Sequence, residues 1–213
     1  MNVDLVWSTP NAEELLAKMA RVSNPSNQDN KETAPRLIAY LIKHKHWSPF
    51  EMIDACFEIE CPRDISRQLL RHTSFRFQEF SQRYAEVTGD LHYREARLQD
   101  ATNRQNSILT YDYTLTEDWD SAQEWVYDTC KHEYDKAIKR GIAKEVARVL
   151  LPEGLTQTKM YMKGNMRSWM HYCQVRMDKS TQKEHREIAE QIYNHCIGLW
   201  PVSFKELCNE VRN

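Results

Sequence analysis

The stretch from Arg71 to Tyr84 reads RHTSFRFQEFSQRY and interleaves basic side chains with amides, hydroxyls and three phenylalanines. Arginine presents a planar, permanently charged fork that matches phosphate and carboxylate oxygens, and hydroxyl and amide groups add short-range donors around the same anion. The composition therefore predicts an anion-binding pocket. A basic surface loop anchored to the core by its aromatic rings would have a similar composition, so the order of the residues must decide.

The order of these residues resembles the signature of the flavin-dependent thymidylate synthases. The stretch begins with the pattern R-H-x at residues 71–73. After seven further residues it continues with the pattern S-x-R at residues 81–83. The family signature usually begins R-H-R, whereas this chain has Thr73 at the third place.

Thr73 removes a permanent positive charge that the family usually places beside its flavin site. Arg76, three residues later, is absent from the usual pattern. Because a loop of this length can bring both positions within about 8 to 10 Å, we expect Arg76 to restore the charge.

Three further motifs flank this stretch in the order that the family has. HWSPFE at 46–51 resembles H-x-[ST]-P-F-E, VARVLLP at 146–152 resembles V-A-R-x-x-L-P, and NMRS at 165–168 resembles N-x-R-S. With Arg176 after them, the resemblance extends over residues 1–205.

The resemblance implies an α+β, ThyX-like fold in which helices pack on an antiparallel sheet, as one domain over residues 1–213. It implies a homotetramer with active sites at subunit contacts. The implied reaction is the reductive methylation of dUMP to dTMP, with 5,10-methylenetetrahydrofolate as carbon donor, FAD as cofactor and NADPH as reductant. The protein would supply orientation and electrostatics, because the redox chemistry belongs to the cofactor.

Carried over position by position, the resemblance implies two overlapping sets of site residues. The flavin set is Ser48, Glu51, Arg71, His72, Thr73, Glu79, Asn165, Arg167 and His171. The nucleotide set is Gln68, Glu79, Phe80, Ser81, Gln82, Arg83, Arg148 and Arg176, of which Arg176, Arg148 and Ser81 are the candidate catalytic residues. The family more often has Asn at position 171 and Gly at position 82.

Residue chemistry suits this division. The Ser81 hydroxyl, the backbone amides beside it and the Arg83 fork can converge on one terminal phosphate. Arg148 and Arg176 can reach the uracil carbonyls and stabilise the negative charge that develops when a hydride adds to the ring. Ser81 could instead act as a nucleophile, but that role needs a base beside it, and the sequence assures none.

Arg148 lies among the apolar residues of the 146–151 segment. We expect its side chain to be buried and paired with an anion, because an unpaired buried charge is costly. The anion is either a ligand or a structural partner such as Glu145 or Glu153.

Local patterns predict the elements that carry these residues. Alternation over Met52–Cys61 predicts a strand with one buried face. A helix after Pro62 would place Gln68, Arg71 and His72 on one face. Asn165 can cap a helix that carries Arg167 and His171, and further helical patterns occupy 116–140, 181–199 and 201–211.

Composition limits the alternatives. A net charge of -2 and a pI near 6.5 give no global attraction to nucleic acid or membrane, and no run of 18 apolar residues is present. The six cysteines form no C-x-x-C pair, which favours packing thiols in a cytoplasmic protein over a metal site. The alternative function is a single-stranded nucleic-acid-binding module that uses the arginines and phenylalanines of 71–84.

Overall fold

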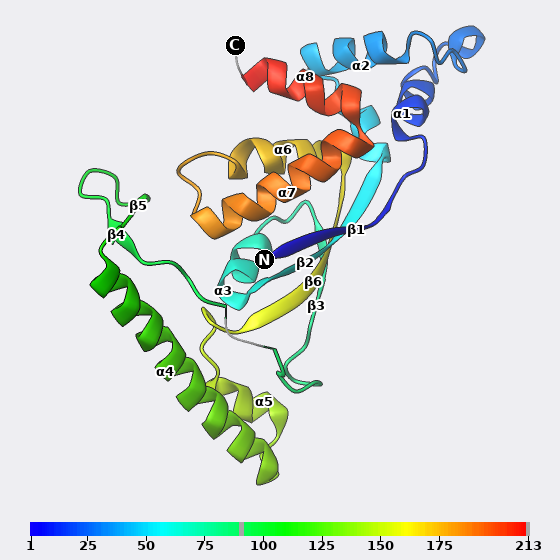
Figure 1. Ribbon diagram of the computed structural model, residues 1–213. Coiled ribbons are helices and arrows are strands. Elements are labelled where there is room, and N and C mark those ends of the chain that lie inside the picture. The colour runs from blue at the N-terminus through cyan, green and yellow to red at the C-terminus, as the bar shows by residue number, and fades with distance from the viewer. Residues whose placement is uncertain (90–91, 212–213) are drawn as a thin grey trace.

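The computed structural model describes residues 1–89 and 92–211, with side chains described through residue 206. Its centre is a four-stranded antiparallel sheet in the order β1 (Asn2–Ser8), β2 (Asp54–Pro62), β6 (Gln157–Asn165) and β3 (Arg76–Glu79), shown in Figure 1. The two central strands pair along their full length, from Asp54 with Asn165 to Pro62 with Gln157. The expected α+β class with an antiparallel sheet is confirmed.

Strand β2 forms because its sequence alternates between two environments. Ala55, Phe57 and Ile59 have no exposed surface. Glu58 and Glu60 point to the opposite face, where Lys159 of β6 binds them at 2.7 and 2.9 Å. The predicted buried face of this strand is therefore confirmed, and ion pairs occupy the other.

Helices cover the apolar face of the sheet (Figure 1). Two of them carry candidate site residues: α3 (Arg63–Leu69) and α6 (Met166–Arg176). Helix α7 (Lys183–Leu199) packs against both. Asn165 Oδ1 accepts a hydrogen bond from the Ser168 backbone N–H at 2.9 Å, which confirms the predicted cap of α6. The remaining elements at this end of the fold are α1 (Ala12–Ala20), α2 (Ala34–Lys43), α8 (Pro201–Val211) and the 3-10 turns η1 (Pro25–Asn27) and η2 (Ser48–Met52).

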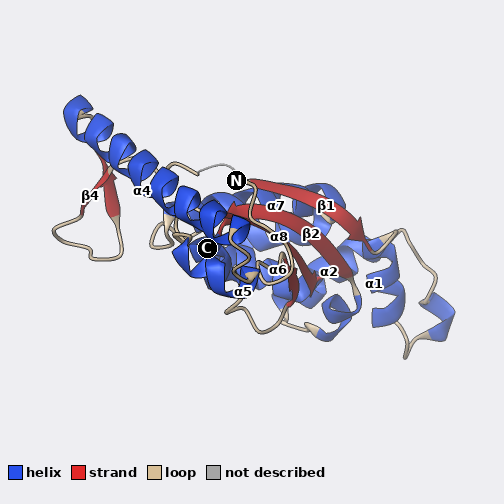
Figure 2. Cartoon of the chain, turned by 90° about the horizontal axis from the view of Figure 1, so that it is seen from below, coloured by secondary structure: helices blue, strands red, loops and turns tan. Residues whose placement is uncertain are grey.

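An arm extends away from this body, as Figures 1 and 2 show. It consists of the hairpin β4 (Arg97–Gln99) and β5 (Ser107–Leu109) and the long helix α4 (Tyr113–Lys139). The far end of α4 packs on α5 (Lys144–Ala147) and η3 (Arg148–Leu150) in a second apolar cluster around Tyr134. The sequence predicted α4 but neither strand of the hairpin.

The Phe75 ring lies so close to Gly164 of the central sheet that a side chain at position 164 would clash with it. A Cβ added to Gly164 of β6 would lie 2.4 Å from both Cδ1 and Cε1 of the Phe75 ring. The Phe75 ring also packs on Trp169, with 4.4 Å between ring centroids. The loop that carries Phe75 therefore approaches the sheet so closely that position 164 must be a glycine.

Four of the six cysteines have the packing role that the sequence pattern predicts. Cys56, Cys61, Cys173 and Cys196 are buried and unpaired, and Cys130 is half-buried. Cys208 lies beyond the described side chains. Within 1–89 and 92–211, no cluster of metal-binding side chains occurs. In the same residues, no helix is long and apolar enough to span a membrane.

Candidate functional site

Three helices meet at a polar cluster, which consists of Gln68, His72, Arg176, Gln182 and His185. His72 follows the C-terminal end of α3, and Arg176 is the last residue of α6. The Arg176 Nε–H donates to His72 Nε2 at 3.0 Å. The Gln68 side-chain N–H donates to Gln182 Oε1, just before α7, at 2.7 Å. His72 from the flavin set thus directly contacts Arg176 from the nucleotide set.

The histidines of this cluster are neutral. Burial, with Arg176 and His171 nearby, lowers the pKa of His72 to about 4. Burial, with Arg176 and His72 nearby, lowers the pKa of His185 to about 3. A neutral His72 can accept the Arg176 hydrogen bond, which a doubly protonated ring could not. Arg176 is therefore the permanent cation of the cluster.

Glu79 is held by protein groups on the inner face of β3. Its carboxylate accepts hydrogen bonds from the Ser66 hydroxyl at 2.8 Å, from the Thr158 hydroxyl at 3.1 Å and from Arg67. Arg63 lies 3.6 Å away and is buried. These partners fix the orientation of the Glu79 carboxylate.

Four members of the flavin set line one cavity of about 580 Å³. Glu51 comes from η2, Asn165 is the N-cap of α6, and Arg167 and His171 lie on α6. Arg167 forms an ion pair with Glu51. Two sequence motifs more than a hundred residues apart are therefore brought together. The other lining residues are Trp47, Ser74, Ser168, Met170 and Gln174.

The rest of the flavin set lies outside this lining. Ser48 and Arg71 are exposed, and His72 belongs to the polar cluster described above. Thr73 is exposed and directly precedes the lining residue Ser74. The Arg76 guanidinium donates to the Thr73 backbone oxygen at 3.1 Å, so a cation does lie beside position 73.

Arg83 and Arg148 meet at α5. Arg83 Nε lies 3.5 Å from a Glu145 carboxylate oxygen, and Arg148 Nε–H donates to the Glu145 backbone oxygen at 3.3 Å. The expectation that Arg148 is buried is wrong. It is half-exposed, and its neighbour Val149 is 81% exposed, because η3 lies on the surface with only its Leu151 end packed inward.

The three residues before Arg83 differ in their exposure. Phe80 is 38% exposed, and Ser81 is half-buried at the start of a turn in which its backbone oxygen accepts from Tyr84 at 3.0 Å. Gln82 is buried. Among the described residues of this single chain, no histidine or lysine forms a hydrogen bond with the Ser81 hydroxyl.

The stacking platform of the nucleic-acid alternative is incomplete, because only Phe80 of the three phenylalanines is exposed. Phe75 is only 3% exposed and packs on Trp169, and Phe77 is half-buried on the inner face of β3. Rings that are buried in the core cannot stack on the bases of a strand.

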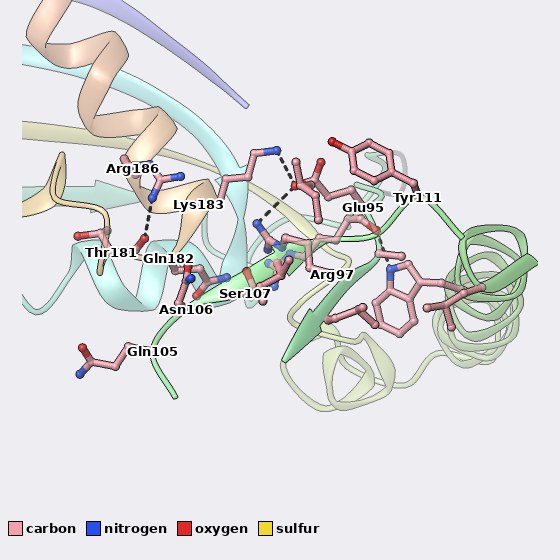
Figure 3. Close-up of a pocket in the computed structure, with 17 residues that line it drawn as sticks. Glu95, Arg97, Gln105, Asn106, Ser107, Tyr111, Thr181, Gln182, Lys183 and Arg186 are labelled. Carbon is pink, nitrogen blue, oxygen red and sulfur yellow. Dashed lines mark hydrogen bonds and ion pairs between the residues drawn. The ribbon is translucent and has the colours of Figure 1, made fainter. Parts of the chain in front are cut away.

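A cavity of about 1020 Å³ lies where the arm meets the body and was not predicted from the sequence (Figure 3). The hairpin contributes Arg97, and α7 contributes Lys183 and Arg186. Lys183 and Arg97 both bind Glu95, at 2.5 and 3.6 Å. The basic residues at the start of α7 belong to no recognised motif, so only the contact with the arm reveals this site.

The chain is similar to known proteins over most of its length. The family model described as thymidylate synthase complementing protein matches residues 4–202. A probable flavin-dependent thymidylate synthase of Paramecium bursaria Chlorella virus 1 is 48% identical over 92% of this chain and 90% of its own. A flavin-dependent thymidylate synthase of Synechocystis sp. is 49% identical over 83% of this chain and 80% of its own.

A solved structure has the same fold. The UMP/dUMP methylase PolB from Streptomyces cacaoi, bound with 5-Br dUMP, superposes with a TM-score of 0.87 at 27% identity. The match covers 98% of this chain and 94% of that one. Sequence motifs, fold and relatives agree, and the chain belongs to the flavin-dependent thymidylate synthase family.

Proposed function

We propose that this chain is a flavin-dependent thymidylate synthase that methylates dUMP to dTMP, with 5,10-methylenetetrahydrofolate as carbon donor and NADPH as reductant. The observation that carries the proposal is the cavity in which Glu51, Asn165, Arg167 and His171 meet. Its volume of about 580 Å³ lies within the range of cofactor pockets. Its guanidinium, imidazole and amide groups suit the phosphates and ring edges of a flavin.

When bound, FAD supplies the reducing equivalents. The protein groups bind and orient. We assign phosphate binding to Arg83, Ser81 and the backbone amides between them, since a guanidinium fork and a hydroxyl match phosphate oxygens. Gln68 and Arg176 donate to the nucleotide from the polar cluster, and Glu79 is the oriented anion beside them.

Arg176 is the residue to which we assign the catalytic electrostatic role. Its Nε–H is engaged with His72, which orients the guanidinium and leaves the other N–H donors available for an oxygen of the uracil ring. Negative charge that develops on that oxygen is stabilised by a donor already in place. Arg148 is only half-buried in a single copy, so we assign it to a site that a second copy completes.

We infer that the working assembly is a homotetramer of one-domain subunits with its sites at subunit contacts. The arm supports this inference, because it leaves several apolar side chains exposed. Leu98 and Ile108 are each 48% exposed, Leu109 is 49% exposed and Tyr111 is 94% exposed. Apolar surface gathered in this way is typical of an interface between copies.

The purified protein should be yellow, with absorption near 370 and 450 nm (roughly, as a property of flavin), and should form dTMP from dUMP only with the folate donor and NADPH. Arg167→Ala should lose most of its flavin, because it removes the cation of the cavity. The matched control is Arg36→Ala, an exposed arginine on α2. A colourless protein without dTMP formation would contradict the proposed function.

Arg83→Ala should weaken dUMP binding by about 1.5 to 3 kcal/mol, the contribution of a charge-assisted hydrogen bond, and should leave flavin bound. Titration of dUMP into the flavin-loaded protein measures the loss, again with Arg36→Ala as the control. Unchanged nucleotide affinity would mean that Arg83 serves only its ion pair with Glu145.

A further inference from the structure

Five side chains form a continuous hydrogen-bonded chain. It runs from the cavity of about 1020 Å³, where the arm meets the body, to the polar cluster. Arg97 donates to Glu184 Oε1 at 2.5 Å, and the Gln182 side-chain N–H donates to Glu184 Oε2 at 2.8 Å. The Gln68 side-chain N–H donates to Gln182 Oε1 at 2.7 Å. At the far end, His185 Nδ1 lies 3.2 Å from Gln68 Oε1.

The chemistry of Glu184 sets the direction of every bond in this chain. Burial alone would raise the pKa of Glu184, but its own backbone N–H, Gln182 and Arg97 hold that pKa below its usual value. An ionised carboxylate only accepts hydrogen bonds, so Gln182 must turn its nitrogen toward Glu184 and its oxygen toward Gln68. Gln68 must then donate through its nitrogen, which leaves its oxygen facing His185.

His185 can offer only one ring proton to its neighbours. Its side chain has no exposed surface and packs beside His72 and Tyr172, with ring centroids 6.0 and 5.8 Å away. Its low pKa keeps the ring neutral. Facing the Gln68 oxygen, Nδ1 must carry the proton. Nε2, which has no hydrogen-bond partner among the described residues, is then the unprotonated nitrogen.

We propose that His185 is a positioning residue that, with Gln182, locks the Gln68 amide in the orientation that presents its second N–H to an acceptor oxygen of the pyrimidine nucleotide. This inference rests on the proposed function. An amide free to rotate by 180° exchanges its donor and its acceptor, so an unlocked Gln68 would present the wrong group part of the time. The lock removes that ordering cost before the nucleotide binds.

Nothing in the sequence patterns assigns this role to His185. It lies on the buried face of α7 with Ile188, Ala189 and Ile192, where an apolar residue would fit the helical period. Gln182 occupies the N-cap position of α7, but its side chain makes no capping hydrogen bond and is turned to Gln68 instead.

The test compares variants of His185 in two backgrounds. His185→Leu removes the donor, whereas His185→Asn keeps an N–H close to the position of Nδ1. In the wild-type background, His185→Leu should raise KM for dUMP about five- to tenfold with kcat within about twofold, the pattern of lost uniform binding. His185→Asn should stay within about twofold of the wild-type KM.

The second background is Gln68→Leu. If His185 acts through Gln68, His185→Leu should add nothing to the loss that Gln68→Leu already causes. Losses that multiply in the double variant would overturn the positioning role, as would a His185→Asn variant as impaired as His185→Leu. Flavin occupancy and the unfolding temperature show whether each variant is folded.

The tautomer of His185 tests the lock without any variant. In protein labelled with 15N in its histidine rings, His185 should show a protonated Nδ1 and a bare Nε2, assigned by the loss of its signals in His185→Asn. An Nε2-protonated ring would overturn the inference. Wild-type protein that binds no dUMP would overturn the proposed function together with it, whereas intact dUMP binding with multiplying losses would overturn the His185 role alone.

Discussion

Gly164→Ala should lower the free energy of unfolding by about 3 kcal/mol or more, which is the upper range for overpacking a core. The added Cβ would lie 2.4 Å from two carbons of the Phe75 ring. That ring cannot move aside, because Trp169 lies 4.4 Å away and Tyr172 5.9 Å away between ring centroids. Urea unfolding followed by circular dichroism measures the loss.

Two further variants distinguish this cause from a general effect of replacing glycine. Gly198→Ala in α7, where no neighbouring atom lies within 4 Å, should be neutral or stabilising, because alanine favours a helix. Phe75→Leu should cost less in the Gly164→Ala background than in the wild type, because the smaller side chain relieves the clash. A Gly164→Ala protein as stable as the wild type would show that the loop can move away from the sheet.

Arg176→Ala should lower kcat by about 10² to 10³, which corresponds to about 3 to 4 kcal/mol of lost transition-state stabilisation. Arg176 lies at the end of α6, where His72 accepts its Nε–H at 3.0 Å and fixes the guanidinium. Arg176→Lys should recover little of the rate, since one ammonium group cannot hold His72 and also present a planar pair of donors.

Single-turnover measurements with saturating dUMP separate this effect from nucleotide binding. Arg36→Ala on α2 is the control, and flavin content must match the wild type in every variant. A rate for Arg176→Ala within about fivefold of the wild type would remove Arg176 from the catalytic role and leave it as a structural partner of His72.

Local sequence patterns predicted the elements whose signals lie within a few consecutive residues, such as a regular alternation of buried and exposed side chains or a helix cap. The alternation in β2 and the Asn165 cap of α6 are properties of a few consecutive residues. Strand β3 was missed because only its pairing with β6, more than eighty residues later, makes Arg76–Glu79 a strand. The hairpin of the arm was missed because each strand has only three residues.

The predictions about the candidate site also divide into those that family motifs supplied and those that needed the three-dimensional contacts. The family motifs brought Glu51 and Arg167 together correctly, since both line one cavity, although their roles toward a flavin remain a prediction. The prediction that Arg148 is buried was wrong, because apolar neighbours along the chain do not show which side of a short helix faces the core. His185 was missed because a buried histidine on an apolar face has the period of a core residue.

The pairing of β2 with β6 has a consequence for how the chain folds. These strands are joined by roughly 95 intervening residues, all of which must be looped out before the central pair of the sheet can close. Contacts of such long sequence separation place folding in the slower range of milliseconds to seconds. Until β6 arrives, β2 has one unpaired edge and an uncovered row of Phe57, Ile59 and Cys61, so aggregation competes with folding during that interval.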